Sequence, residues 1–272
     1  MDWQLAGRVA VVTGAGRGLG RAITDAFLAA GAVVAAVDLD GPDLRALAEG
    51  PLADAARGEA FVCDVTSTPA VDATVAAIVA RFGRIDVVVN NAGVMGEGLV
   101  DELDDATWQR CFDVNTTGVF RVCRAVLPVM KRQRSGRIVN AASFAAIVPS
   151  AGSAAYAASK AAVVQFTRTL AGEVGPWGIT ANSYAPGMVP SQINHFTELP
   201  AERQARLLDT LTIRRWGDPA EVADVVLFLA SDAARYVTGT LVDVSGGKLA
   251  TQLPERAYQL AEQARGVDSL AP

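Results

Sequence analysis

Short apolar runs rich in β-branched residues alternate along the chain with longer segments whose apolar residues recur at helical spacing. In one helical segment, for example, Leu19, Ile23, Phe27 and Ala30 share a face. Runs that are apolar throughout, such as residues 9–12 and 87–89, are expected in a parallel sheet that helices cover on both faces. Seven strands are predicted, at residues 8–13, 33–38, 60–63, 86–90, 137–142, 179–183 and 240–244.

This alternation predicts an α/β, doubly wound Rossmann fold: a seven-stranded parallel sheet with helices on both faces, in a single domain. We expect the domain to span residues 1–247 and to include a substrate lid at about residues 187–216, where prolines interrupt the regular order. Residues 248–272 form a C-terminal extension in which Pro254 is expected to begin a helix. The extension either packs across a subunit interface or frays.

The composition argues against several classes of protein. The 272 residues have a net charge of -5 without a dense run of Lys or Arg, so neither nucleic acid nor an anionic membrane is expected as a partner. Cys63, Cys111 and Cys123 are widely spaced and lack any Cys/His pairing, so we expect no disulfide and no metal. The chain shows no signal-peptide pattern, and a cytoplasmic location is expected.

Tyr156 and Lys160 are four residues apart in an Ala-rich segment. If this segment is helical, both side chains leave the same face and the ammonium can lie near the phenol. Lowering the pKa of a tyrosine from near ~10 to about 7 requires roughly 4 kcal/mol of preferential stabilisation of the phenolate. A fixed positive charge can supply much of it. Ser143 could return from a preceding strand and donate a hydrogen bond to a substrate oxygen.

The first predicted strand is followed by the Gly-rich string TGAGRGLG at residues 13–20, which opens the first helix. Glycines let the backbone approach a pyrophosphate closely, and the free amide groups and positive dipole of the helix terminus bind it. A Gly-rich turn alone could be only a tight connection. Its position after the first strand favours dinucleotide binding.

Asp38 stands at the end of the second predicted strand, where a carboxylate can accept hydrogen bonds from both ribose hydroxyls of an adenosine. A 2′-phosphate there would be repelled by about 4 kcal/mol at ~4 Å and an effective dielectric near 20. Arg17 could instead pair with that phosphate. Giving Asp38 the greater weight, we expect NAD(H) to be preferred and NADP(H) to be the alternative cofactor.

Further motifs follow in order: Asp64-Val65, the NNAG string at residues 90–93, Asn115 in a VNTTG context, Ser143, the YAASK string at residues 156–160, and Pro186-Gly187. With these motifs, the chain resembles the short-chain dehydrogenase/reductase family from about Leu5 to Gly247. That family is NAD(P)-dependent and is characterised by the TGxxxGxG and YxxxK patterns.

The resemblance implies a role for each matched position. Tyr156 would be the general acid/base, Ser143 would orient or polarise the substrate oxygen, and Asn115 would hold a water that links Lys160 to solvent. Lys160 would also bind the nicotinamide ribose, and no metal is needed. The implied cofactor-binding residues are Gly14, Arg17, Gly18, Leu19, Gly20, Asp38, Asp64, Val65, Asn91, Ala92, Gly93, Tyr156, Lys160, Pro186, Gly187, Val189 and Ser191.

Two positions depart from the family pattern. Ser191 stands where the family commonly has Thr, and it keeps a hydroxyl for the nicotinamide carboxamide. Ser245 replaces the acidic residue usual before the final pair of glycines, a change to which we assign no mechanistic meaning at this point.

The expected substrate side of the site is apolar, which indicates an uncharged, partly hydrophobic substrate; ordinary core packing is the alternative explanation. His195, the one histidine, lies in the predicted lid and is either a substrate contact or a solvated side chain. Arg214 and Arg215, also in the lid, leave an anionic substrate open. The candidate substrate residues are Phe144, Met188, Ile193 and Phe196.

We therefore expect an NAD-dependent oxidoreductase, a short-chain alcohol dehydrogenase or carbonyl reductase, that transfers a hydride between nicotinamide and a secondary alcohol or ketone. The alternative is a 3-oxoacyl-thioester reductase of the same family that acts on a carrier-protein-linked or CoA-linked group with NADPH. A more distant alternative is a noncatalytic NAD-binding protein. The resemblance also implies a homo-oligomer, most often a homotetramer.

Overall fold

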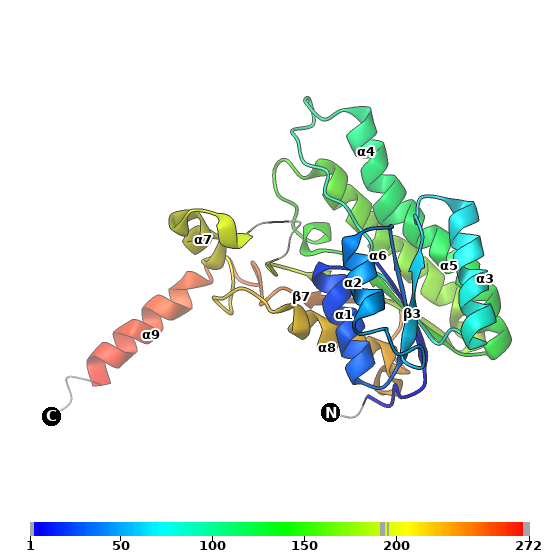
Figure 1. Ribbon diagram of the computed structural model, residues 1–272. Helices are drawn as coiled ribbons and strands as arrows, with labels where there is room; N and C mark the ends of the chain where they lie inside the picture. The colour runs from blue at the N-terminus through cyan, green and yellow to red at the C-terminus, as the bar shows by residue number, and fades with distance from the viewer. Residues whose placement is uncertain (1–2, 191–193, 195, 269–272) are drawn as a thin grey trace.

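A seven-stranded parallel sheet forms the centre of the molecule, in a computed structural model that describes residues 3–190, 194 and 196–268 (Figure 1). The strand order is β3-β2-β1-β4-β5-β6-β7. The winding therefore reverses between β1 and β4, the topological switch point at which open α/β sheets bind their ligands. The strands are β1 Val9–Thr13, β2 Val33–Asp38, β3 Gly58–Val62, β4 Val87–Asn90, β5 Gly136–Ala141, β6 Ile179–Pro186 and β7 Leu241–Val244.

Helices cover both faces of the sheet. On one face Phe27 of α1 and Leu229 of α8 belong to a buried cluster with Val12 and Val89; on the other, Ile78 of α3 and the apolar sides of α5 and α6 pack on the sheet. The helices are α1 Gly18–Ala29, α2 Pro42–Glu49, α3 Thr68–Phe82, α4 Asp105–Phe112, α5 Gly118–Gln133, α6 Ala154–Val174, α7 Ala201–Leu208, α8 Pro219–Ala230 and α9 Glu255–Asp268.

Side-chain caps define several helix ends. Asp218 accepts a hydrogen bond from the backbone N–H of Ala220, and the Glu221 carboxylate accepts one from the Asp218 N–H, so the two residues cap the start of α8 reciprocally. Gly83 ends α3 with a φ of 77°, a left-handed conformation that glycine adopts at no steric cost. These local signals explain why the helices begin and end where they do.

The predicted Rossmann fold is confirmed, and each predicted strand is present. Two strand boundaries differ from the prediction by more than one residue. β3 begins at Gly58, opposite Val34 of β2, and β6 continues to Pro186, opposite Val244 of β7. Because Gly and Pro are poor strand formers, the sequence pattern did not include them, whereas pairing with a neighbouring strand extends the sheet through both.

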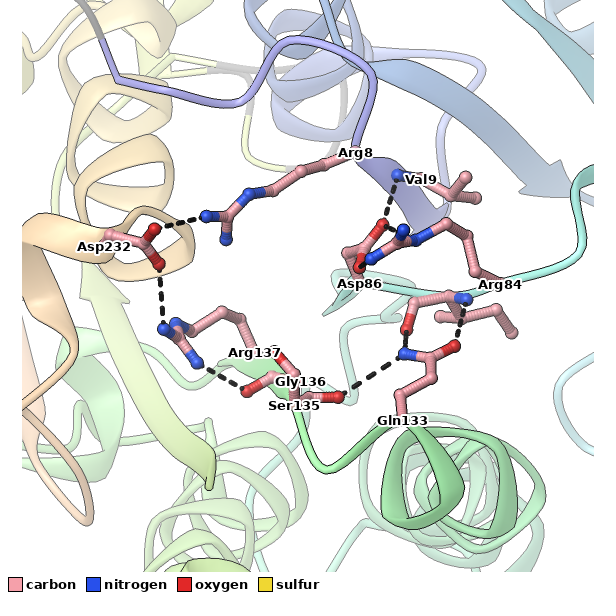
Figure 2. A network of polar contacts seen from close by, with 10 residues as sticks. Arg8, Val9, Arg84, Asp86, Gln133, Ser135, Gly136, Arg137 and Asp232 are labelled. Atoms are coloured by element: carbon pink, nitrogen blue, oxygen red, sulfur yellow. Dashed lines mark hydrogen bonds and ion pairs between the residues drawn. The ribbon is translucent and has the colours of Figure 1, made fainter. Parts of the chain in front are cut away.

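Two anionic side chains bind the amino ends of the strands, on the edge opposite the switch-point crevice (Figure 2). Asp232 pairs with Arg8 at 2.5 Å and with Arg137 at 3.1 Å, so it links the starts of β1 and β5. Asp86, just before β4, accepts two hydrogen bonds from the Arg84 guanidinium, at 2.6 and 2.8 Å. Arg137 is 7% exposed, and burial lowers its pKa while Asp232 opposes the shift.

The segment between β6 and α8 holds α7 and lies apart from the sheet in Figure 1. The predicted short helix in the lid is thus present, as Ala201–Leu208. Helix α9, which follows Pro254 as expected, projects beyond α7 and away from the body of the fold (Figure 1). Tyr258 attaches it to the lid, since its hydroxyl donates to the Thr212 carbonyl at 2.8 Å. The boundary at residue 247 stays a prediction.

Among the helices that the structure describes, none has the length and apolarity needed to cross a membrane. The uncharged stretch near residues 138–159 forms β5, a connecting loop and the start of α6.

Candidate active site

A cavity of about 1260 Å³ opens at the carboxyl ends of the strands. It extends from the Gly-rich loop, past the ends of β2 and β4, to α6 and the lid. Ser191 lies outside the described residues. Every other predicted cofactor residue lines the cavity: Gly14, Arg17, Gly18, Leu19, Gly20, Asp38, Asp64, Val65, Asn91, Ala92, Gly93, Tyr156, Lys160, Pro186, Gly187 and Val189.

The Gly-rich loop is held in place by the strand next to it. The Asn91 amide donates to the carbonyls of Thr13, at 3.1 Å, and Gly14, at 3.2 Å. A Cβ added to Gly20 would clash with the Gly14 carbonyl oxygen, so the loop can lie this close to α1 only with glycine at that position. A Cβ at Gly18, by contrast, would meet open space. The loop therefore presents an open cradle at the start of α1, which fits a dinucleotide pyrophosphate.

Asp38 lines the cavity and also accepts a hydrogen bond from the Gly-rich loop. One carboxylate oxygen accepts from the Gly16 backbone N–H at 2.8 Å, and the other accepts from the Leu39 N–H at 2.8 Å. The Arg17 side chain lines the same cavity and forms no hydrogen bond or ion pair with any residue that the structure describes. The carboxylate charge is thus partly compensated by backbone amides, while the guanidinium is available to a ligand.

Tyr156 and Ser143 lie close to each other in the wall of the cavity. Ser143 follows β5, and Tyr156 lies on the first turn of α6. Burial raises the pKa of Tyr156, and a hydrogen bond with Ser143 opposes this shift. The phenol is therefore protonated at neutral pH in the protein without ligand. A protonated phenol next to a hydroxyl can donate a proton to a carbonyl oxygen.

Lys160 lies one turn after Tyr156 on α6 and is 3% exposed. Its ammonium donates to the Ala141 carbonyl at 2.8 Å and lies 5.9 Å from the centroid of the Tyr156 ring. Burial lowers the pKa of Lys160 to about 8. The predicted one-turn spacing is confirmed, but the charge that was expected to lower the tyrosine pKa is itself weakened by burial.

Asn115 lies in a π-helical turn, Asp113–Thr117, between α4 and α5. Its amide exchanges hydrogen bonds with the backbone of Val94, at 2.8 and 2.9 Å, and donates to Ser159 at 3.0 Å. A Cβ added to Gly93 would lie 3.2 Å from the Asn115 Oδ1 and 3.4 Å from the Lys160 Nζ. Asn115 thus lies behind the cavity wall near Lys160, and its role through a water stays a prediction.

Three of the four predicted substrate residues line the cavity, and their contact with a substrate stays a prediction. Phe144 and Met188 are buried in the cavity wall, and Phe196 also lines the cavity and stacks on Trp216 at 5.6 Å between ring centroids. Ile193 and His195 lie outside the described residues.

The two lid arginines of the sequence analysis do not line the cavity. Arg214 pairs with Asp209, and Arg215 pairs with Glu221 at 2.6 Å. Other cations line it instead, among them Lys248 at the start of the C-terminal extension. Sequence reasoning missed Lys248 because it follows the final glycines and matches no motif.

Tyr184 was also missed. This fully buried residue of β6 donates from its hydroxyl to the Asn91 Oδ1 at 3.2 Å, across 93 residues of chain. Asn91 in turn holds the Gly-rich loop. No sequence signal links the two residues, because only the parallel arrangement of β6 and β4 around β5 brings them together.

Comparisons with known proteins agree with this site. A family model described as Enoyl-(Acyl carrier protein) reductase matches residues 14–248. The 3-oxoacyl-(acyl-carrier-protein) reductase FabG of Thermotoga maritima is 37% identical over 244 residues, which cover 90% of this chain and 98% of the relative. FabG of Pseudomonas aeruginosa is 40% identical, over 89% of this chain and 98% of the relative. The chain belongs to the short-chain dehydrogenase/reductase family and is an oxidoreductase.

A solved structure titled levodione reductase superposes with a TM-score of 0.86 at 36% identity, covering 91% of this chain and 99% of that chain. The match supports the same single-domain fold. It also shows that relatives of similar identity to this chain differ in the substrates that their names state.

The predicted preference for NAD(H) is wrong. The two relatives from Thermotoga maritima and Pseudomonas aeruginosa are FabG enzymes, which use NADPH. The prediction treated Asp38 as an isolated charge that repels a 2′-phosphate. The structure shows instead that backbone N–H groups of Gly16 and Leu39 bind both of its oxygens, and that the Arg17 guanidinium on the same cavity wall is unpaired among the described residues.

Proposed function

We propose that this protein reduces 3-oxoacyl thioesters, linked to a carrier protein or to coenzyme A, with NADPH. The proposal adopts the alternative of the sequence analysis in place of free secondary alcohols or ketones. The observation that supports it most is the protonated Tyr156 beside Ser143 in a large, partly apolar cavity, in a chain whose relatives include 3-oxoacyl-(acyl-carrier-protein) reductases. This arrangement is suited to reduction.

In the proposed reaction the bound dinucleotide supplies the hydride to the carbonyl carbon. Ser143 donates a hydrogen bond to the carbonyl oxygen and orients it toward Tyr156. Tyr156 gives its proton to that oxygen as negative charge develops there, which yields the hydroxyl of the product. Lys160 then supplies positive charge near the phenolate that remains, a stabilisation that is strong in a site with little water.

The residues of the cavity would share the binding of NADPH. The cradle at Gly18 would hold the pyrophosphate, and Arg17 would pair with the 2′-phosphate. Asp64 and Val65, at the far end of the cavity, would lie beside the adenine.

The direct test follows the absorbance of the reduced dinucleotide with 3-oxoacyl thioesters, small ketones and secondary alcohols as separate substrates. We expect turnover of the thioesters with NADPH. Turnover of ketones alone would contradict the thioester proposal and favour the carbonyl reductase that the sequence analysis expected. Binding of NADPH without turnover of any substrate would contradict an enzymatic function.

A homotetramer and a cytoplasmic location stay predictions.

A further inference from the structure

Lys248 lies just after the end of β7, in a position that its neighbours hold in place. Two consecutive glycines with φ of 67° and 70°, Gly246 and Gly247, turn the chain after the strand. The Ser245 hydroxyl then accepts a hydrogen bond from the Lys248 backbone N–H at 3.1 Å. The serine that departs from the family pattern therefore stabilises the turn that presents Lys248.

The backbone on both sides of Lys248 is bound to the lid. Thr212 donates from its hydroxyl to the Gly247 carbonyl at 2.9 Å, and the Leu249 N–H donates to the Thr210 carbonyl at 2.8 Å. A Cβ added to Gly247 would lie 2.9 Å from Thr212, so these segments are in close contact. The base of the Lys248 side chain is thus held by hydrogen bonds on each side.

The Lys248 side chain points into the active-site cavity. Its ammonium lies 5.3 Å from the centroid of the Phe144 ring, and both residues line the cavity. Phe144 directly follows Ser143, and consecutive Cα atoms are about 3.8 Å apart. A positive charge therefore lies against the residue that follows Ser143, the group that orients the substrate carbonyl in the proposed reaction.

This charge has no counter-charge among the residues that the structure describes. The half-buried ammonium forms no hydrogen bond or ion pair with any residue that the structure describes, although Glu97 and Glu102 line the same cavity. Burial lowers the pKa of Lys248, and no carboxylate opposes the shift. Partial burial of an unpaired charge is unfavourable, and an anion supplied by a ligand would remove that cost.

Lys160 differs in that its ammonium has a hydrogen-bond acceptor, the Ala141 carbonyl, and in that it belongs to the proposed catalytic group. The contrast indicates that Lys248 has a separate partner that enters with the substrate.

We propose that Lys248 binds a carboxylate at the end of a short acyl chain, a few bonds from the carbonyl carbon that is reduced. The proposal deepens the proposed function, on which it rests, and replaces the uncharged substrate that the apolar wall suggested. The acyl part is joined directly to the carbonyl that is reduced, so we assign the carboxylate to that part. A phosphate on the pantetheine arm is the alternative anion, and probes that lack this phosphate separate the two.

A matched pair of probes tests this. One is the N-acetylcysteamine thioester of a 3-oxohexanedioyl chain, which ends in a carboxylate; the other is the thioester of the 3-oxohexanoyl chain, which is neutral. The variant Lys248→Met removes the charge and keeps the length, and Lys248→Arg restores the charge. The control Lys131→Met removes a lysine that lies 4.0 Å over the Trp177 ring on another surface.

We expect the native protein to have a kcat/KM for the charged thioester at least about tenfold above that for the neutral one, equivalent to ~1.4 kcal/mol. Lys248→Met should abolish this preference through a higher KM for the charged probe, with kcat and the neutral probe little changed. Lys248→Arg and Lys131→Met should keep it. Equal losses on both probes, or no preference in the native protein, would overturn the proposal.

If neither thioester is reduced, the proposed function is wrong. The role of Lys248 is then tested by ligand binding instead of by turnover. Calorimetric titration of the NADPH-bound protein with hexanedioate should then show binding that Lys248→Met weakens at least about tenfold, ~1.4 kcal/mol, and that Lys131→Met leaves unchanged. Equal binding by the two variants, or no binding by the native protein, would overturn the assignment of Lys248.

Discussion

The Lys160 ammonium donates to the backbone carbonyl of Ala141 at 2.8 Å, while the phenol of Tyr156, one turn earlier on the same helix, lies close to Ser143, which opposes the rise in its pKa. The two side chains therefore share a helix face but have different partners. Ala141 ends β5, and Ser143 lies two residues later. The end of one strand therefore supplies the neighbours of both Tyr156 and Lys160.

Replacement of Tyr156 by Phe should abolish reduction and preserve cofactor binding. The variant keeps the ring and loses only the acidic proton, and general acid catalysis typically contributes about 10²–10⁴-fold to the rate. We expect kcat to fall by that factor, with the dissociation constant of NADPH, measured by fluorescence, unchanged. Tyr236→Phe, at a tyrosine that is 99% exposed, is the control. Substantial turnover by Tyr156→Phe would refute the proposed role.

The stability contribution of Lys160 should depend on pH. Its pKa is about 8 in the folded protein and 10.5 in the reference state. Below pH 8 the buried ammonium is charged and destabilises the fold; between pH 8 and 10.5 the unfolded chain binds more protons, so stability rises with pH. Relative to Lys160→Met, the cofactor-free protein should gain about 3 kcal/mol over this window. Denaturant unfolding at several pH values measures the gain, and a constant difference would contradict it.

Arg17 should select the phosphorylated dinucleotide. Arg17→Gln removes a hydrogen bond to a charged group, worth roughly 1.5–3 kcal/mol, so the KM for NADPH should rise at least about tenfold. The KM for NADH should change little. Arg21→Gln, which removes an exposed pair with Asp25 on the same helix, serves as the control. An equal effect on both dinucleotides would show that Arg17 only shapes the loop.

The hydroxyl of Tyr184 should stabilise the cofactor loop through Asn91. Tyr184→Phe leaves the Asn91 Oδ1 without this partner, and the loss of one buried hydrogen bond typically costs about 1 kcal/mol. We expect a decrease of that size in the free energy of unfolding, together with a higher KM for NADPH and an unchanged pH profile of kcat. Unaltered stability and KM would mean that the packing of the ring alone holds the loop.

Asp232 should contribute more to stability than an ordinary surface carboxylate. Asp232→Ala leaves the buried Arg137 without its counter-charge, but the Asp232 side chain is 42% exposed, which weakens the pair. We expect a loss of about 1–2 kcal/mol, against less than ~1 kcal/mol for Asp25→Ala. Hydrogen bonding to Arg8 lowers the pKa of Asp232, so this stabilisation should be present at neutral pH and lost as the pH falls through the acid range. Equal losses in the two variants would contradict the expectation.

Local patterns predicted the position of several candidate site residues in the fold. The Gly-rich loop, the spacing of Tyr156 and Lys160, and the strand ends that position Asp38 and Ser143 all lie where the sequence indicated. These features depend on residues a few positions apart, or on the rule that parallel strands end at one edge of a sheet. The identity of the cofactor did not follow, because the charge of Asp38 acts together with the backbone amides around it.

The sequence by itself determined the succession of strands and helices, the family, and the one-turn spacing of Tyr156 and Lys160, since each is encoded by periodicity or by short motifs. Only the tertiary structure showed that Tyr184 supports Asn91, that Asp38 is bound by the loop it faces, and that Lys248 lies beside Phe144. In each case the partners come from distant parts of the chain, and their contact depends on how helices, lid and sheet pack around one cavity.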